Sequence, residues 1–523
     1  MSSLSFFDWV VCAGYLVVVL LLGLRFAGHQ HTNEDFFVGG RRMHWLPIGL
    51  SLFAGTFSSL SFVGLPSEAA YHDYHLYLSI LFIPFVVSPI IAWMFLPLYF
   101  RLGLTSAYEY VERRFDRRLR LFCSILFIVY TIGWMGNLLR AVGVILAAIF
   151  DLTPYQTASL LVAVGLFATV YTTLGGVKAV VWTDMLQAVA LGGGMLVVLW
   201  LALTRIDGGW SAVWEIGHRH HRFEMLRTSF STEQGSFFSA KEGNVYAACA
   251  FGFFVYLTGH AISFTAVQRY MSMPSLTAAR WSLVVNGAAA ALVCGLFFAV
   301  GSCLFAFYHQ QESMRPGKNR VNLSSESADF ESDELSSGSA EVSLYVQLRR
   351  QKKEDQLLPH FVMSEIPVAG LMGLLLAGLF AAAMSSVDSG INSMTASIAC
   401  DWMSGREMQL WQSRLLCLCF GITSVIMAVT FYFLGGNVFP LIMKIAGMFF
   451  GLMLAIFLLG MLLPWANTFG VTIGLMCGLT ALALTFYLEI SHWWFGAATC
   501  IPTFIVGGIA SRLVTDAPAD SRH

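Results

Sequence analysis

Residues 365–400 read EIPVAGLMGLLLAGLFAAAMSSVDSGINSMTASIAC. The run is long enough to cross a bilayer, because a membrane-spanning helix needs about 20 mostly apolar residues. Its second half carries Ser385, Asp388, Ser389 and Asn392 at the helical spacing i, i+3, i+4 and i+7, so these side chains share one face. A carboxylate buried in such a helix is costly and needs a function or a partner. The stretch predicts an all-α membrane protein with a polar face inside it.

The composition of the chain agrees with a membrane protein. Of its 523 residues, 57% are hydrophobic and only 12% are charged, whereas about 25% are charged in a soluble domain. The formal net charge is -1, and the sequence has no long basic tract. These values exclude an ordinary soluble enzyme and a disordered chain, and they predict no nucleic-acid partner.

Runs of apolar residues predict a polytopic protein with about thirteen membrane spans. They cover residues 6–26, 45–70, 77–100, 121–150, 155–174, 179–204, 246–268, 281–308, 361–400, 412–434, 438–463, 468–488 and 492–512. We expect a single transmembrane domain over residues 1–523, with a polar, Ser-rich insertion at 309–360 that is predicted to be mobile. The small and polar residues of spans 45–70 and 361–400 indicate either close helix packing or interrupted helices that bind ions.

Lysine and arginine in short loops predict the orientation in the membrane. The basic loops are 25–44, 101–120, 269–280 and 403–414. If they are cytoplasmic, the N-terminus and the 309–360 insertion lie outside and the C-terminus lies inside. The 205–245 loop is also basic and would lie outside, against the trend. The expected location is the cell membrane, either plasma or inner.

The polar face of the 361–400 span is the first candidate site. Its hydroxyl and carboxylate oxygens suit a hard cation. Hydrogen bonds between helices would explain its serines, but they would not explain Asp388. A second candidate is Asp184 in GGVKAVVWTDMLQ (175–187), inside the span that follows two chain-breaking glycines. Asp184 could serve a site, or it could cap or pair with a neighbour near the membrane surface.

Two basic residues stand inside apolar spans. Arg140 lies in IGWMGNLLRAVGVILAAIF and Lys444 in FPLIMKIAGMFFG. A cation at that depth is a candidate for function, and arginine suits a carboxylate. Arg140 could instead extend to the membrane surface or pair with a buried acid, and Lys444 could form a salt bridge between helices. Histidines in GHRHHRFE (217–224) match no standard metal spacing, so no transition metal is predicted.

Several motifs, in the right order along nearly the whole chain, resemble the sodium/solute symporter family. They are EDFFVGGRR (34–42), SLFAGTFSSLSFVGLP (51–66), YEYVERRF (108–115), GGVKAVVWTDMLQ (175–187), VQRYMSM (267–273), DQLLPHFV (355–362), SSVDSGIN (385–392) and GMLLPWANTFG (460–470). The last two look most like the iodide, multivitamin and monocarboxylate branch. The resemblance implies a leucine-transporter-type core of two inverted five-helix repeats, with one extra helix before it and two after it.

The resemblance also implies a main sodium site between the first and eighth core helices. Its ligands would be the backbone carbonyls of Ala54, Phe57 and Ala382 and the hydroxyls of Ser385 and Ser386. Some members hold a second sodium, and its ligands here would be Asp184, Ser385, Asp388 and Ser389. Asp388 departs from the family, where Ser or Ala is usual. It could bind the cation more tightly, or one carboxylate could be protonated by its like-charged neighbour.

The expected function is sodium-coupled import of a small organic solute by alternating access. Candidate substrate contacts are Thr56, Ser61, Ser263, Arg140 and Lys444, and the two cations favour an organic anion. Ser61 stands where the sugar transporters have Gln, which disfavours a sugar. The alternatives are proton-coupled symport on the same fold and a membrane-embedded sensor. We expect a monomeric functional unit in the lipid bilayer, sodium as coupling ion, no cofactor and no enzymatic activity.

Overall fold

The computed structural model describes residues 5–27, 32–226, 244–314, 344–351, 353–365, 368–403, 408–435 and 445–514, and every regular element in these ranges is helical. The first half of the chain contains α1 (Phe6–Ala27), α2 (Asn33–Val38), α3 (Trp45–Thr56), α4 (Ser59–Tyr71), α5 (His75–Phe82), α6 (Ser88–Ile90), α7 (Leu96–Leu102), α8 (Ala107–Arg114), α9 (Arg117–Phe150), α10 (Pro154–Leu203) and α11 (Gly209–Arg219). The second half contains α12 (Val245–Ala261), α13 (Phe264–Met271), α14 (Leu276–Ser313), α15 (Leu344–Arg350), α16 (Leu357–Glu365), α17 (Leu371–Ser397), α18 (Leu410–Leu434), α20 (Met453–Leu462), α21 (Thr468–Tyr487) and α22 (Phe495–Leu513). Single helical turns are η1 (Gly39–Arg41), η2 (Ile83–Val87), η3 (Ile91–Phe95), η6 (Glu354–Gln356), η7 (Ile398–Trp402), η8 (Met448–Leu452) and η9 (His492–Trp494).

The described residues contain ten helices long and apolar enough to cross a membrane, or up to twelve when two bent pairs are counted as one span each. The prediction counts thirteen spans because it treats residues 155–174 and 179–204 as two spans; α10 contains both of them, on either side of a kink. Gly176 breaks that element, with φ 56° and ψ -162°, a conformation that glycine alone adopts readily.

The predicted span 361–400 is wrong at its start. Residues up to Glu365 form the separate helix α16, and the spanning helix α17 begins at Leu371. Asp8 of α1 fixes this start, because its Oδ1 accepts hydrogen bonds from the N–H groups of Gly370 and Gly373 at 3.0 and 2.9 Å. A carboxylate is stabilised at the positive N-terminal end of a helix.

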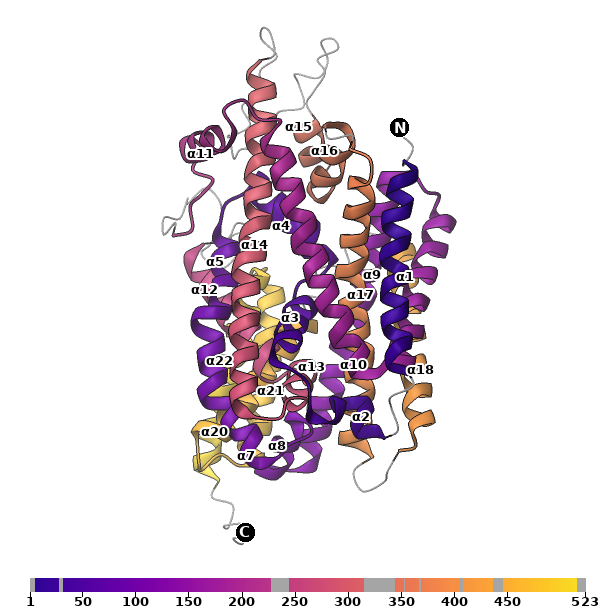
Figure 1. The fold of residues 1–523 in the computed structure, drawn as a ribbon. Coiled ribbons are helices and arrows are strands. Elements are labelled where there is room, and N and C mark those ends of the chain that lie inside the picture. Colours follow the sequence, from indigo (N-terminus) through magenta and orange to yellow (C-terminus); the bar gives the residue numbers. More distant parts are fainter. Residues whose placement is uncertain are drawn as a thin grey trace.

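The long helices run in one bundle, with α11, α15 and α16 at one end and α2 and α8 at the other (Figure 1). The insertion predicted at 309–360 begins inside α14 and ends in α15, η6 and α16, whereas its residues 315–343 and 352 lie outside the described ranges. α17 is the most enclosed candidate span, with 89% of its most apolar window buried, against 22% for α1. Its polar face is therefore turned to protein and not to lipid.

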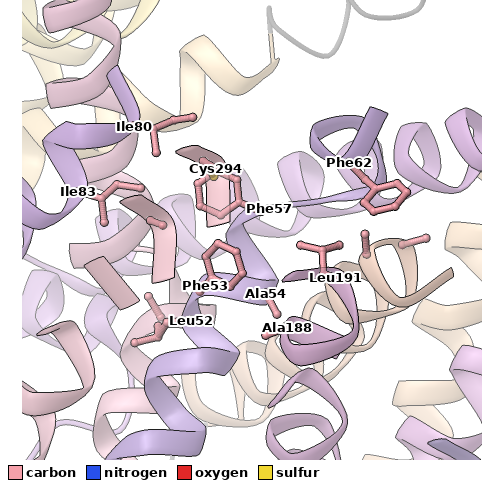
Figure 2. Close-up of a cluster of buried hydrophobic side chains, with 14 of the residues drawn as sticks. Leu52, Phe53, Ala54, Phe57, Phe62, Ile80, Ile83, Ala188, Leu191 and Cys294 are labelled. Carbon is pink, nitrogen blue, oxygen red and sulfur yellow. The ribbon is translucent and has the colours of Figure 1, made fainter. Parts of the chain in front are cut away.

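Two spans are bent in the middle. α3 and α4 meet at 63°, and α12 and α13 meet at 50°. The first bend arises because Phe57 and Ser58 are extended, with ψ values of 115° and -179°. Figure 2 shows apolar side chains around this bend, including Phe53 and Phe57 of the α3 end and Cys294 of α14. These buried apolar side chains pack around the bend. The helix interruption predicted within residues 45–70 is therefore present.

Candidate functional site

A cavity of about 640 Å³ lies beside both bends, a size suited to a small-molecule ligand. Its lining at one end includes Tyr71, His72 and Arg222, together with Arg349 of α15. Its lining at the bends includes Gly55, Thr56, Phe57, Ser263, Ser386 and Ser389. The cavity thus extends from the α11 and α15 end of the bundle to the interrupted helices.

The residues of the predicted main sodium site meet where the α3–α4 bend touches α17. Ser385 Oγ is 3.0 Å from the Ala54 carbonyl and 3.2 Å from the Ala382 carbonyl. Ser386 Oγ lies 3.5 Å from the same Ala382 oxygen. The bend allows this, because α3 ends at Thr56 and the Ala54 carbonyl turns to α17 instead of continuing the helical ladder. The fifth predicted ligand, Phe57, lies at the bend itself. Hydroxyl and carbonyl oxygens of this kind suit a hard cation.

The predicted second cation site holds a guanidinium group. Arg269 Nη2 lies 2.9 Å from Asp184 Oδ2 and 2.5 Å from Ser389 Oγ. Ser51 Oγ joins them, donating to Asp184 Oδ2 at 2.5 Å and accepting from Arg269 Nε at 2.6 Å. Asp184 is fully buried and Arg269 is 3% exposed. The positive charge of Arg269 therefore balances the charge of Asp184.

The other two predicted ligands of that site face elsewhere. Asp388 Oδ2 accepts from the Tyr171 hydroxyl at 2.5 Å, and its Oδ1 accepts from the Ser389 N–H at 2.7 Å. Ser385 belongs to the first cluster. The structure thus brings Asp184 and Ser389 together, places Asp388 against α10, and leaves two carboxylates near one guanidinium.

Assigning Arg269 to a cytoplasmic loop was wrong. The residue belongs to α13, whose sequence FTAVQRYM surrounds Gln268 and Arg269 with apolar residues. The bend after α12 turns this short helix back into the protein, where Gln268 Nε2 donates to the Phe37 carbonyl and to Asn392 Oδ1, both at 2.7 Å. The sequence offered only a weak signal, which is that Arg269 directly follows the predicted span 246–268 and has the apolar residues Val267 and Met271 two positions away on either side.

The five candidate substrate contacts have different outcomes. Thr56, Ser61 and Ser263 line the cavity. Arg140 is on α9 and is not among the lining residues, so the structure does not bring it to this cavity. Lys444 lies outside the described residues. Within the described part of the chain, no group of three or more His, Cys, Asp or Glu side chains is arranged to hold a metal ion.

Sequence reasoning missed His260, which lines the cavity from the last turn of α12. Its Nδ1 is 2.9 Å from the Tyr256 carbonyl, and its Nε2 is 3.4 Å from Thr56 Oγ1. A histidine within the apolar run YLTGHAISF (256–264) was the available signal. The ring joins the two bent spans across the cavity.

The described C-terminal part of the insertion contacts the C-terminal end of α4. Tyr345 of α15 stacks on Tyr71 with ring centroids 4.3 Å apart, and its hydroxyl donates to the Ala70 carbonyl at 2.7 Å. Arg222 donates to the Tyr71 and His72 carbonyls at 2.6 and 2.9 Å. His72 Nε2 lies 3.5 Å from Glu354 Oε2. These contacts form the rim of the cavity.

The profile of the sodium:solute symporter family matches residues 36–321 and 338–478. The sodium/sialic acid symporter SiaT of Proteus mirabilis is 27% identical over 526 residues, covering 99% of this chain and 97% of that protein. The human sodium-coupled monocarboxylate transporter 1 is 30% identical and covers 90% of this chain and 72% of its own length. The human sodium/iodide cotransporter is 31% identical, and the match covers 92% of this chain and 70% of that protein.

Solved structures resemble the fold. A Na+-coupled sialic acid symporter in a substrate-bound outward-open state gives a TM-score of 0.81 at 26% identity, covering 98% of this chain and 99% of the other. Mhp1, a nucleobase-cation-symport-1 family transporter in a closed conformation, gives 0.53 at 13% identity, covering 91% and 94%. The prediction of an all-helical, leucine-transporter-type membrane fold is confirmed.

Proposed function

Because the chain belongs to the sodium:solute symporter family, we propose that it uses a sodium gradient to import a small organic anion by alternating access. It is a sodium-coupled solute symporter and a multi-pass membrane protein, and it is a transporter rather than an enzyme. The proposal adds the chemical class of the solute, the direction of transport and the residues involved.

The contact between the cavity and the Ala54–Ser385 cluster carries the proposal. Thr56 and Phe57 line the cavity, and both follow Ala54 at the end of α3. A sodium ion bound by the Ala54, Phe57 and Ala382 carbonyls and the Ser385 and Ser386 hydroxyls would tie the bend to α17. The same ion would fix the cavity wall that Thr56 forms, so ion and solute would stabilise one arrangement together.

The arginines of the cavity lining support an anionic solute. Arg222 and Arg349 line it, although the acids Glu68 and Asp73 also do; Arg269 adds no net charge, because it is paired with Asp184. Relatives named above carry sialic acid and monocarboxylates, which are organic anions. Arg140, predicted from sequence to bind the anion, has no place in this proposal because it does not line the cavity. Thr56, Ser61 and Ser263 are the proposed neutral contacts.

The structure, with its cavity open at one end and closed at the other, corresponds to one of the two access states of an alternating-access transporter. The cavity opens toward the α11 and α15 end, whereas the Asp184–Arg269 pair closes the other end. Gln268 and a backbone hydrogen bond from Met43 to Ser272 at 3.0 Å add to that closure. We place the α11 and α15 end outside the cell, as the loop charges predict, so this is the outward-facing state.

The geometry favours the main site as that of the coupling sodium. Asp184 and Ser389 already bind the Arg269 guanidinium, so a second sodium at Asp184, Ser385, Asp388 and Ser389 would have to displace it or share its ligands. The ratio of charge to solute moved, measured at fixed membrane potential in proteoliposomes, tests this. One sodium per monovalent anion gives electroneutral transport, and an extra sodium gives one net positive charge per cycle.

Uptake by proteoliposomes tests the proposed function. We expect an inward sodium gradient to drive accumulation of a carboxylate such as lactate or N-acetylneuraminate, with no accumulation when choline replaces sodium. A neutral sugar is the matched negative substrate. Accumulation driven by a proton gradient without sodium would favour the proton-coupled alternative. Sodium-dependent solute binding without flux would favour the sensor.

A further inference from the structure

His260 is held rigidly at the cavity by hydrogen bonds from two tyrosines to the backbone. The Tyr270 hydroxyl donates to the His260 carbonyl at 2.9 Å, and the Tyr99 hydroxyl donates to the Ala261 carbonyl at 2.7 Å. Both tyrosines are fully buried, and His260 itself is 3% exposed while lining the cavity. The position of its ring is therefore set before any solute arrives.

The hydrogen bond of Nδ1 fixes which ring nitrogen carries the proton. Nδ1 is 2.9 Å from the Tyr256 carbonyl, and a carbonyl can only accept, so Nδ1 must be the N–H donor. Among the described residues, the hydrogen bonds of the ring go to the Tyr256 carbonyl and to Thr56 Oγ1, and neither group is an acidic side chain. A buried imidazole without such a partner is favoured as the neutral form. Nε2 is then a hydrogen-bond acceptor.

This acceptor has one long hydrogen-bond contact among the described residues. Thr56 Oγ1 lies 3.4 Å from it, beyond the usual range for a strong hydrogen bond. A hydroxyl has one proton, and the shorter contact of Thr56 Oγ1 is to the Leu52 carbonyl at 2.9 Å, so the carbonyl and Nε2 compete for that proton. A donor that approaches more closely would satisfy Nε2 better than Thr56 does. Nε2 is therefore ready to accept from a group that enters the cavity.

We propose that His260 Nε2 accepts a hydrogen bond from a hydroxyl or N–H group of the transported anion, so that donor-bearing carboxylates are selected over carboxylates without a donor. The inference rests on the proposed function and narrows its substrate class. Ser61 and Ser263 also line the cavity, but a hydroxyl can donate or accept and so tolerates either kind of solute group. Nε2 can only accept a hydrogen bond, so it favours solutes that carry a donor over solutes that carry none.

Pairs of acids that differ in one hydroxyl test the inference. Sodium-driven uptake into proteoliposomes is measured for lactate against propanoate and for mandelate against phenylacetate. We expect a KM lower by about tenfold or more for the hydroxylated member of a transported pair. His260→Phe keeps a ring but removes the acceptor, and it should bring the two KM values together. His260→Gln keeps an acceptor oxygen and should restore part of the preference.

The possible results separate this inference from the proposed function. If neither a carboxylate of these pairs nor N-acetylneuraminate gives sodium-driven uptake, the proposed function fails and the inference fails with it. If only N-acetylneuraminate is carried, a KM in His260→Phe equal to that of the wild type overturns the inference, and a KM raised by about tenfold or more supports it. If both members are carried with equal KM by the wild type, or if His260→Phe keeps the wild-type preference, only the inference is overturned. If His260→Phe does not fold, as judged by circular dichroism and gel filtration in detergent, His260→Gln decides: a preference that is kept at least in part supports an acceptor role, and loss of the preference overturns it.

Discussion

Ser385 joins two helices through one hydroxyl that is shared between two carbonyl groups. Ser385 Oγ lies 3.0 Å from the Ala54 oxygen and 3.2 Å from the Ala382 oxygen. A single proton cannot satisfy both carbonyls fully. A cation placed among these atoms would bind both carbonyls and the lone pairs of the hydroxyl, which is the role that we propose for the sodium ion.

Ser385→Ala is therefore expected to raise the sodium concentration for half-maximal uptake by about tenfold or more, because an oxygen ligand to a charge is lost. Sodium titrations of uptake and of tryptophan fluorescence measure the change. Ser424→Ala is the matched control: Ser424 is also a buried helix serine, and it bonds to the Phe420 carbonyl of its own helix at 2.9 Å. Equal sodium dependence in both variants would contradict the assignment of Ser385.

The Asp184–Arg269 pair is expected to behave as one buried unit. Arg269→Met should lower the free energy of unfolding by about 3–5 kcal/mol, because it leaves a buried carboxylate without its partner. The double variant Asp184→Leu with Arg269→Met removes both charges and should be less destabilised than Arg269→Met alone. Denaturant unfolding in detergent for the two singles and the double measures the coupling. Strictly additive losses would show that the two side chains do not interact.

α10 is assigned over 50 residues and is interrupted at Gly176, with no proline at the break. Gly176→Ala is expected to lower the free energy of unfolding by about 1–3 kcal/mol, because its backbone conformation is strained for any residue with a Cβ. Gly193→Ala in the same helix is the control, since an added Cβ there would meet nothing within 4 Å, and it should be neutral or slightly stabilising. Thermal unfolding of the two variants decides. A smaller loss at Gly176 than at Gly193 would contradict the strain.

Local composition predicted most helices because a span must be long and apolar wherever it packs. The glycine break before Asp184 was also predicted, since glycine acts within its own few residues. The start of α17 was not, because residues 361–363 are apolar and extend the apparent span, whereas the boundary depends on Asp8, more than 350 positions away. The partners of Arg269 and Asp388 were missed for the same reason: helix bends and contacts with distant helices place them.

The α11 and α15 end of the bundle contains a titratable contact between distant segments. Burial alone would lower the pKa of His72, but the hydrogen bond to Glu354 and the charges of Glu68 and Glu354 outweigh burial and raise that pKa. A raised pKa in the folded state means that the contact stabilises the fold below the usual histidine pKa of about 6.5. The stabilisation is lost as the pH rises through the folded-state pKa.

Glu354→Gln should therefore lower the Tm at pH 6, and its effect on the Tm should become smaller as the pH rises and His72 loses its proton. Tm measured between pH 5.5 and 9 for both proteins checks this. Glu215→Gln is the control, because Glu215 pairs with Arg219 on the exposed helix α11 and arginine does not titrate in this range. A Glu354→Gln effect that is constant or grows with pH would contradict the role of His72.

α14 is an unbroken helix of 38 residues, which makes it about 57 Å long, against a hydrocarbon core of about 30 Å. Several of its turns must stand clear of the lipid. Near its C-terminal end, Gln310 exchanges two hydrogen bonds with the backbone of Asp207, at 3.1 and 2.8 Å. The C-terminal end of α14 is therefore a rigid helix that extends beyond the lipid near the α11 end of the cavity. A nanobody that binds this end of α14 would add a rigid fiducial for electron cryo-microscopy, and its epitope would lie outside the detergent belt.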